Sequence, residues 1–201
     1  MRPRRCDGFT LLEILVTLSL LAAVIATLAG GLRLGTRAWE SARVGASLDE
    51  ANLIVRALAG QLARAFPAKL PRADGSSIVA FDGGPEWCRF VALSDGMANW
   101  GGLVTTEIGR DDMRALDAWT QVFRESDFGV TRQGMRSIRL SDALLDLRFS
   151  YFGSPALGER PRWRDDWHAA PAPPRLVRLI VRLRGTSGPV ESAVTVALPL
   201  R

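Results

Sequence analysis

Glu13 is the residue whose type and position most need a chemical explanation. It is the only strongly polar side chain in an apolar run over residues 9–28, because hydroxyls such as that of Thr17 can return to helix carbonyls. A carboxylate inside a membrane-spanning helix costs about 2.5–3.5 kcal/mol, so it is usually retained for a partner of opposite charge. The chemistry that we expect from Glu13 is therefore charge pairing.

Few other residues have the types that support enzymatic chemistry. The chain of 201 residues has one histidine, His168, which excludes a metal site built from several histidines within one chain. The acidic pairs at 111–112 and 165–166 lack the spacing of a calcium loop and are expected to be exposed turns. Neither a Walker-type loop nor a dinucleotide-binding glycine motif is present. We expect no catalytic residues, no metal and no cofactor.

The charge balance does not indicate a nucleic-acid partner. The formal net charge is +5, but the arginines are spread through the chain, and the longest basic run is Arg4–Arg5. A surface that binds nucleic acid normally gathers its basic residues on one face or stripe. Cys88 is the only cysteine after Cys6 and is expected to be a buried thiol.

The apolar run around Glu13 predicts a helix that spans a membrane. Twenty residues at about 1.5 Å of rise each cover about 30 Å, the thickness of the hydrocarbon core of a bilayer. The arginines at 2, 4 and 5 favour a cytoplasmic N-terminus. A cleaved secretory signal peptide is the alternative, and residues 29–31 are small enough to form its cleavage site. Glu13 argues against it, because such a peptide has no use for a carboxylate there.

The hexapeptide from Gly8 to Glu13, Gly-Phe-Thr-Leu-Leu-Glu, follows a short basic leader and opens the apolar helix. In this arrangement it resembles the class III signal of the type IV pilin-like family. The resemblance implies that a prepilin peptidase cuts between Gly8 and Phe9, removes residues 1–8 and methylates the new N-terminus at Phe9. It also implies that Glu13 meets the N-terminal amine of a neighbouring subunit during assembly. An intrachain pair, or a protonated Glu13, is the alternative.

The apolar pattern continues beyond the predicted span, with no proline before Pro67. Residues 9–34 are expected to form the transmembrane and assembly helix, and 35–67 an amphipathic helix whose apolar stripe packs on its own domain. Glycines at 30, 31, 35 and 45 make bends or breaks plausible between the two. The stripe consists of Leu48, Ala51, Val55, Leu58, Leu62 and Phe66.

Residues 68–201 predict a β-rich domain. Short apolar or alternating runs are separated by Gly, Pro, Asp and Asn. In the run over 145–152 the odd positions are expected to share one face, and 176–184 is expected to pair with 190–198 as a hairpin. The fold class is therefore α+β. The predicted strands cover 78–81, 87–93, 103–108, 119–123, 145–152, 176–184 and 190–198.

The C-terminal third carries a second resemblance. A strand ending at 149–153 precedes Trp163 and Trp167, and a proline-led strand follows at 174–179. This order resembles the minor pseudopilin J family of the type II secretion system, which implies a long N-terminal helix and a β domain of two sheets. Trp163 and Trp167 could form an interface patch or cap one edge of a sheet, and the sequence leaves both open.

Together the two resemblances imply a structural subunit and not an enzyme. Its expected partners are the other minor pseudopilins, the major pseudopilin, the prepilin peptidase and the inner membrane. It would be a single-pass protein with a cytoplasmic N-terminus and a periplasmic β domain. It would act at the tip of a pseudopilus that exports folded proteins across the outer membrane. A minor pilin of a type IV pilus or competence system is the first alternative. A membrane-anchored periplasmic enzyme is the second, and the scarcity of histidine argues against it.

Overall fold

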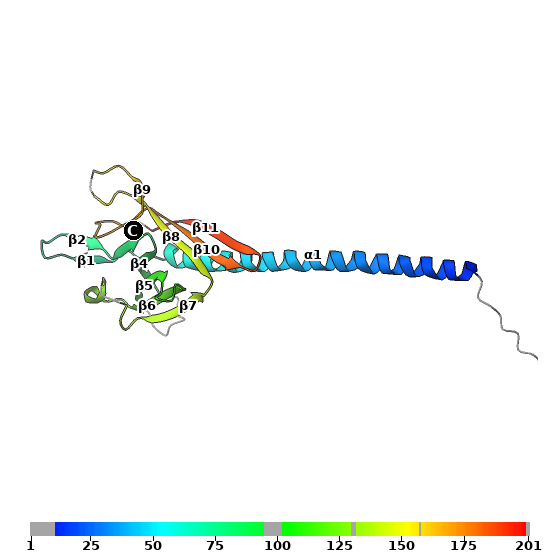
Figure 1. Cartoon of the computed structure of the whole chain (residues 1–201). Coiled ribbons are helices and arrows are strands. Elements are labelled where there is room, and N and C mark those ends of the chain that lie inside the picture. Colours follow the sequence, from blue (N-terminus) through cyan, green and yellow to red (C-terminus); the bar gives the residue numbers. More distant parts are fainter. Residues whose placement is uncertain (1–10, 95–101, 130–131, 157, 200–201) are drawn as a thin grey trace, which may run out of the picture. The chain divides into compact units, whose positions relative to one another are not determined.

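The computed structural model describes residues 11–94, 102–129, 132–156 and 158–199 (Figure 1). The chain divides into two units, Met1–Gly45 and Ala46–Arg201, and each is described by itself. One helix, α1, runs from Leu11 to Ala63. No interruption in helical structure occurs at the four glycines.

The first unit consists of the N-terminal part of α1. Its apolar residues Leu11 to Leu34 are exposed in the isolated chain. The hydroxyls of this segment are satisfied within the helix, because Thr17 Oγ1 donates to the Glu13 carbonyl at 2.9 Å and Thr27 Oγ1 to that of Val24 at 2.8 Å. Local hydrogen bonding of this kind lets hydroxyl residues enter an apolar environment at little cost.

The second unit is rich in β-structure, as the sequence predicts. A five-stranded antiparallel sheet has the order β3-β4-β5-β6-β7, a four-stranded sheet has the order β11-β10-β8-β9, and β1 pairs with β2. The small β1–β2 pair adds a third sheet to the two that were expected. The bounds are β1 Lys69–Pro71, β2 Ser77–Val79, β3 Phe81–Gly84, β4 Trp87–Leu93, β5 Leu103–Arg110, β6 Leu116–Val122, η1 Glu125–Asp127, β7 Arg136–Ser141, β8 Leu144–Gly153, β9 Arg162–Arg164, β10 Leu176–Gly185 and β11 Gly188–Ala197.

One hydrophobic core joins the C-terminal part of α1 to both large sheets. The predicted stripe is right in its centre, where Ala51, Val55, Leu58 and Leu62 are all at most 3% exposed. Its two ends are wrong, because Leu48 is 40% and Phe66 42% exposed. Burying a valine or leucine side chain contributes about 1.5–3 kcal/mol, so Val55, Leu58 and Leu62 anchor the sheets to this part of the helix.

A bulge in β8 changes which of its residues face the core. The expected row of odd positions fails at Leu145, which is 36% exposed, whereas Leu144 is buried. The strand register shows the reason. Leu183 of β10 pairs with Leu144, whereas the preceding residue, Arg182, pairs with Asp146, so Leu145 has no partner in β10. An extra residue in one strand shifts the alternation by one position. From Leu147 onward the predicted face is confirmed, with Phe149 and Tyr151 buried.

The closing hairpin agrees closely with the sequence. β10 and β11 pair antiparallel from Gly185 and Gly188 to Leu176 and Ala197. The core-facing residues of β10 are fully buried, and Arg178 and Arg182 lie on the exposed face, as the alternation predicts. In Figure 1, β8, β10 and β11 run side by side as one sheet.

Candidate functional site

The residues expected to be processed, Gly8 and Phe9, lie outside the residues that the structure describes. Cleavage and methylation there stay predictions. Glu13 is described and is located in the first turn of α1. A carboxylate at this end of a helix is stabilised by the partial positive charge of the free backbone N–H groups. In the sequence, Glu13 is four positions after Phe9, where the expected cleavage would create an amine.

The helix that carries Glu13 has the dimensions of a membrane anchor. Residues Leu11–Arg37 form a span that contains an 18-residue stretch with a mean hydropathy of 2.4, and none of its residues is buried within the chain. By length and composition alone it could cross a bilayer, a test that signal sequences also pass. The exposed apolar surface needs either lipid or another protein to cover it.

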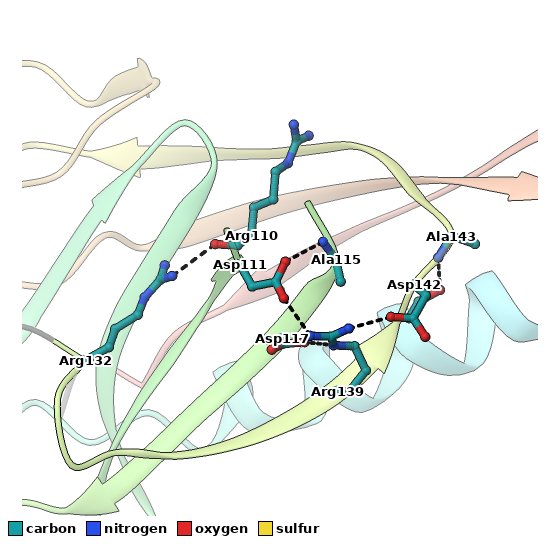
Figure 2. A network of polar contacts seen from close by, with 9 residues as sticks. Arg110, Asp111, Ala115, Asp117, Arg132, Arg139, Asp142 and Ala143 are labelled. Carbon is teal, nitrogen blue, oxygen red and sulfur yellow. Dashed lines mark hydrogen bonds and ion pairs between the residues drawn. The ribbon is translucent and has the colours of Figure 1, made fainter. Parts of the chain in front are cut away.

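Several carboxylates of the β domain have structural partners. Figure 2 shows three of them, from Asp111, Asp117 and Asp142, converging on the Arg139 guanidinium at 2.5–2.6 Å. Asp111 thus belongs to an ion-pair network, and the prediction of an exposed turn is wrong for this residue. Hydrogen bonds to these carboxylates, first of all to Asp142, raise the pKa of Arg139. The guanidinium supplies the positive charge that the cluster needs.

A second ionic group lies within the five-stranded sheet. Glu107 on β5 is 3% exposed and accepts hydrogen bonds from Arg89 and from Nε of Arg132, the latter at 2.7 Å. Arg132 also stacks on the Trp119 ring, with its guanidinium carbon 3.7 Å from the ring centroid, and donates to the Arg110 carbonyl (Figure 2). A buried carboxylate with two arginines is compensated in charge and held in place. It is a structural element and not a free acid.

Cys88 is buried, as the sequence predicts. Burial raises the pKa of its thiol far above the usual range, so the protonated form persists. The neighbouring Tyr151 is also buried, which raises the pKa of its hydroxyl. That hydroxyl donates to the carbonyls of Gly84 and Trp87, both at 3.0 Å. These two groups therefore have a structural role in the core.

The two tryptophans have different environments. Trp167 is 1% exposed, and its indole N–H donates to the Ala172 carbonyl at 3.2 Å, which makes it a core residue. Trp163 lies on the edge strand β9, is 39% exposed, contacts the Phe152 ring and has Arg178 over its face at 4.4 Å. The structure does not bring them together as one patch. Trp163 covers part of the outer sheet face at its edge.

The sole histidine, His168, contacts the Asp82 carboxylate through its Nδ1 on the surface. Over the described ranges, no three His, Cys, Asp or Glu residues are grouped so that they could hold a metal ion. Sequence reasoning did not find the networks around Arg139 and Glu107. Their only sequence signal was the presence of charged residues within strand-like runs, such as Arg89, Glu107 and Asp117.

Comparisons with known proteins support the two resemblances. The model of the prokaryotic N-terminal methylation motif matches residues 3–29. Over 212 aligned residues the chain is 28% identical to type II secretion system protein J of Xanthomonas campestris pv. campestris. The alignment covers 99% of this chain and 95% of that protein. The similarity therefore extends from the leader through the closing hairpin, and the resemblance inferred from the sequence is confirmed.

Proposed function

We propose that this chain is a minor pseudopilin of a type II secretion system. The observation that carries the proposal is the combination of an N-terminal methylation motif with similarity to a protein J over 99% of the chain. The motif alone fits any pilin-like protein. Similarity that continues through the β domain favours the secretion branch over a minor pilin of a type IV pilus or competence system.

The fold supports a function by association. α1 presents an apolar surface of membrane-spanning length, with one carboxylate near its beginning. When such a helix leaves the bilayer, its apolar surface must be covered by neighbouring helices, and Glu13 must meet a positive charge. The methylated amine of Phe9 in a neighbouring subunit is the partner with the right charge. Helix packing and this ion pair together would insert the subunit into a filament.

The finer role follows from the same proposal. The N-terminus lies in the cytoplasm, because Arg2, Arg4 and Arg5 precede the span, and residues 46–201 lie in the periplasm. The subunit joins the other minor pseudopilins at the tip of the pseudopilus, above the major pseudopilin. It initiates assembly there and supports the export of folded proteins. None of these steps requires a catalytic group in this chain.

Removal of the leader provides the direct test of the proposed processing. We expect the wild-type chain, co-expressed with a prepilin peptidase, to lose residues 1–8 and to carry N-methyl-Phe9 by mass spectrometry. Gly8→Ala should remain full-length. Gly30→Ala is the matched control, because a Cβ there meets no atom within 4 Å, and it should be processed normally. A Gly8→Ala protein of mature size would contradict the proposed cleavage.

A further inference from the structure

The strand β11 forms one edge of the four-stranded sheet, and its hairpin determines which of its backbone groups are left over. The turn consists of two residues, Thr186 and Ser187, closed by the pair Gly185 and Gly188. In a two-residue hairpin this closing pair exchanges hydrogen bonds, and the pairs beyond it alternate between bonded and non-bonded. The N–H groups of β11 therefore point alternately toward β10 and away from it.

Two hydrogen bonds fix the phase of this alternation. Arg184 directs its N–H away from β11, to the Ala143 carbonyl at 2.7 Å, so its partner Pro189 belongs to a non-bonded pair. Leu198, just past the end of β11, donates to Arg175 at 3.1 Å, on the β10 side. The even-numbered residues thus face β10. The residues whose N–H and carbonyl groups point away from β10 are Glu191, Ala193, Thr195 and Ala197.

These outward groups are open to another chain. All four residues are exposed, and within the described part of the protein their N–H groups have no acceptor. Within β11, proline occurs only at position 189, where the first outward N–H would be. Natural edge strands are usually protected by short length, charged side chains or proline within the strand. Over the rest of its length, β11 has only Glu191 as such a charge.

The other edges of the two large sheets contrast with β11. β9 has three residues, and β7 carries Arg136 and Arg139 among its six. β3, with four residues, makes a further bridge from Gly83 to Trp167. β11 has ten residues, and eight of them follow the proline. It is the long edge on which an added strand could form several hydrogen bonds.

We propose that β11 receives an extended strand from another pseudopilin of the same assembly, which continues the four-stranded sheet across the subunit boundary. The inference rests on the proposed function, and it names a surface of the β domain in addition to the helix contacts. Toward the core side the added strand meets Val190 and Val194, which are half-buried and favour apolar residues opposite them. On the solvent side it meets Glu191 and Thr195, which favour uncharged or basic residues.

Proline substitutions in β11 test its outward N–H groups without removing its hydrogen bonds to β10. Thr195→Pro and Ala193→Pro each remove one outward N–H and leave the hydrogen bonds to β10 in place. Thr195→Ala is the matched control, because it trims the side chain and keeps the N–H. The full-length variants are co-expressed with the other pseudopilins of the same organism, and recovery of these pseudopilins in the purified complex is measured. Circular dichroism and thermal unfolding monitor the fold of each variant.

We expect both proline variants to recover about tenfold less of one sibling pseudopilin, since loss of one or two backbone hydrogen bonds and the clash of the ring suffice for this. Thr195→Ala should bind like the wild type. Amide hydrogen exchange gives an independent readout, and the complex should protect Glu191, Ala193 and Thr195.

Three results would overturn the inference, and a fourth would overturn the proposed function on which it rests. Unchanged exchange at these amides in the wild-type complex, or proline variants that bind like the wild type, would show that the edge is not used, and would leave the proposed function intact. A wild-type chain that pairs through β11 only with a second copy of itself would replace the heteromeric partner. A wild-type chain that recovers no sibling pseudopilin at all would contradict the proposed function itself.

Discussion

Arg139 on β7 and Asp117 on β6 are cross-strand partners, and Nε of Arg139 donates to Asp117 Oδ1 at 2.6 Å. The Asp117 side chain is 7% exposed, whereas that of Arg139 is 42% exposed. The arginine therefore reaches in from the surface to neutralise a nearly buried carboxylate. Arg139 also binds Asp111, in the connection between β5 and β6, and Asp142, in the connection between β7 and β8 (Figure 2). It therefore holds both connections against this strand pair.

Arg139→Met should destabilise the β domain, because it leaves the Asp117 carboxylate without its positive partner. We expect a measurable loss in the free energy of unfolding, smaller than for a fully buried pair because Arg139 is partly solvated. Asp117→Asn in the Arg139→Met background should recover part of the loss, since it removes the uncompensated charge. Thermal and urea unfolding of the wild type, the two single variants Arg139→Met and Asp117→Asn, and the double variant measure the coupling. Strictly additive effects would show that the two residues do not depend on each other.

Gly83→Ala should be destabilising, because a Cβ at this position would overlap the hydroxyl of Tyr151. The cost of such overpacking is about 1–3 kcal/mol. Tyr151→Phe alone should cost about 1–2 kcal/mol, since the Gly84 and Trp87 carbonyls lose their donor. In the double variant the overlap with the hydroxyl is removed while the overlap with the ring carbon Cζ stays, so its loss in unfolding free energy should be only somewhat smaller than the sum. A double variant at or above that sum would refute the close contact.

Cys88 should be unreactive in the folded protein. Its buried thiol has a raised pKa, and the thiolate is the form that reacts, so alkylation at pH 8 should be slow until the domain unfolds. Cys6→Ser removes the other cysteine from the unprocessed chain. Maleimide labelling followed by mass spectrometry, with and without urea, measures the difference. Fast labelling without denaturant would contradict the burial of Cys88.

Glu13→Ala should leave leader removal and the β domain intact and reduce incorporation into the assembly. We expect recovery of the other pseudopilins to fall by about tenfold, because a neighbouring amine would lose its charge partner in an apolar environment. Thr17→Ala is the control one turn further along α1, since the Thr17 hydroxyl bonds only within the helix. Equal recovery with Glu13→Ala and with the wild type would exclude the proposed role of Glu13.

Periodicity predicted much of the fold because burial depends directly on it. The stripe through Ala51, Val55, Leu58 and Leu62 and the closing hairpin of 176–184 with 190–198 are both found in the structure. The predicted burial of Leu145 was wrong because a one-residue bulge reverses the alternation of buried and exposed residues, and no residue type in this strand indicates the bulge. The strand β7 was missed because its alternation is limited to two apolar residues, Ile138 and Leu140, in a short run that also contains two arginines.

The polar features of the domain were beyond sequence reasoning for a different reason. Arg139 lies 28 residues from Asp111 in the sequence, and Arg132 lies 25 from Glu107. Only the strand register brings such residues together. Glu13 and the Gly8–Phe9 junction, in contrast, are features of a continuous motif, and a continuous motif can be identified from the order of the residues alone.

Export of a folded protein measures the central claim most directly. In a strain that lacks the gene for this chain, an exoprotein of the type II secretion system should accumulate in the periplasm, and the wild-type gene should restore it to the medium. The Gly8→Ala gene should fail to do so, and the Gly60→Ala gene, whose added Cβ meets no atom within 4 Å, should succeed. Normal export without the gene, accompanied by loss of surface pili or of DNA uptake, would contradict the account and assign the chain to a pilus.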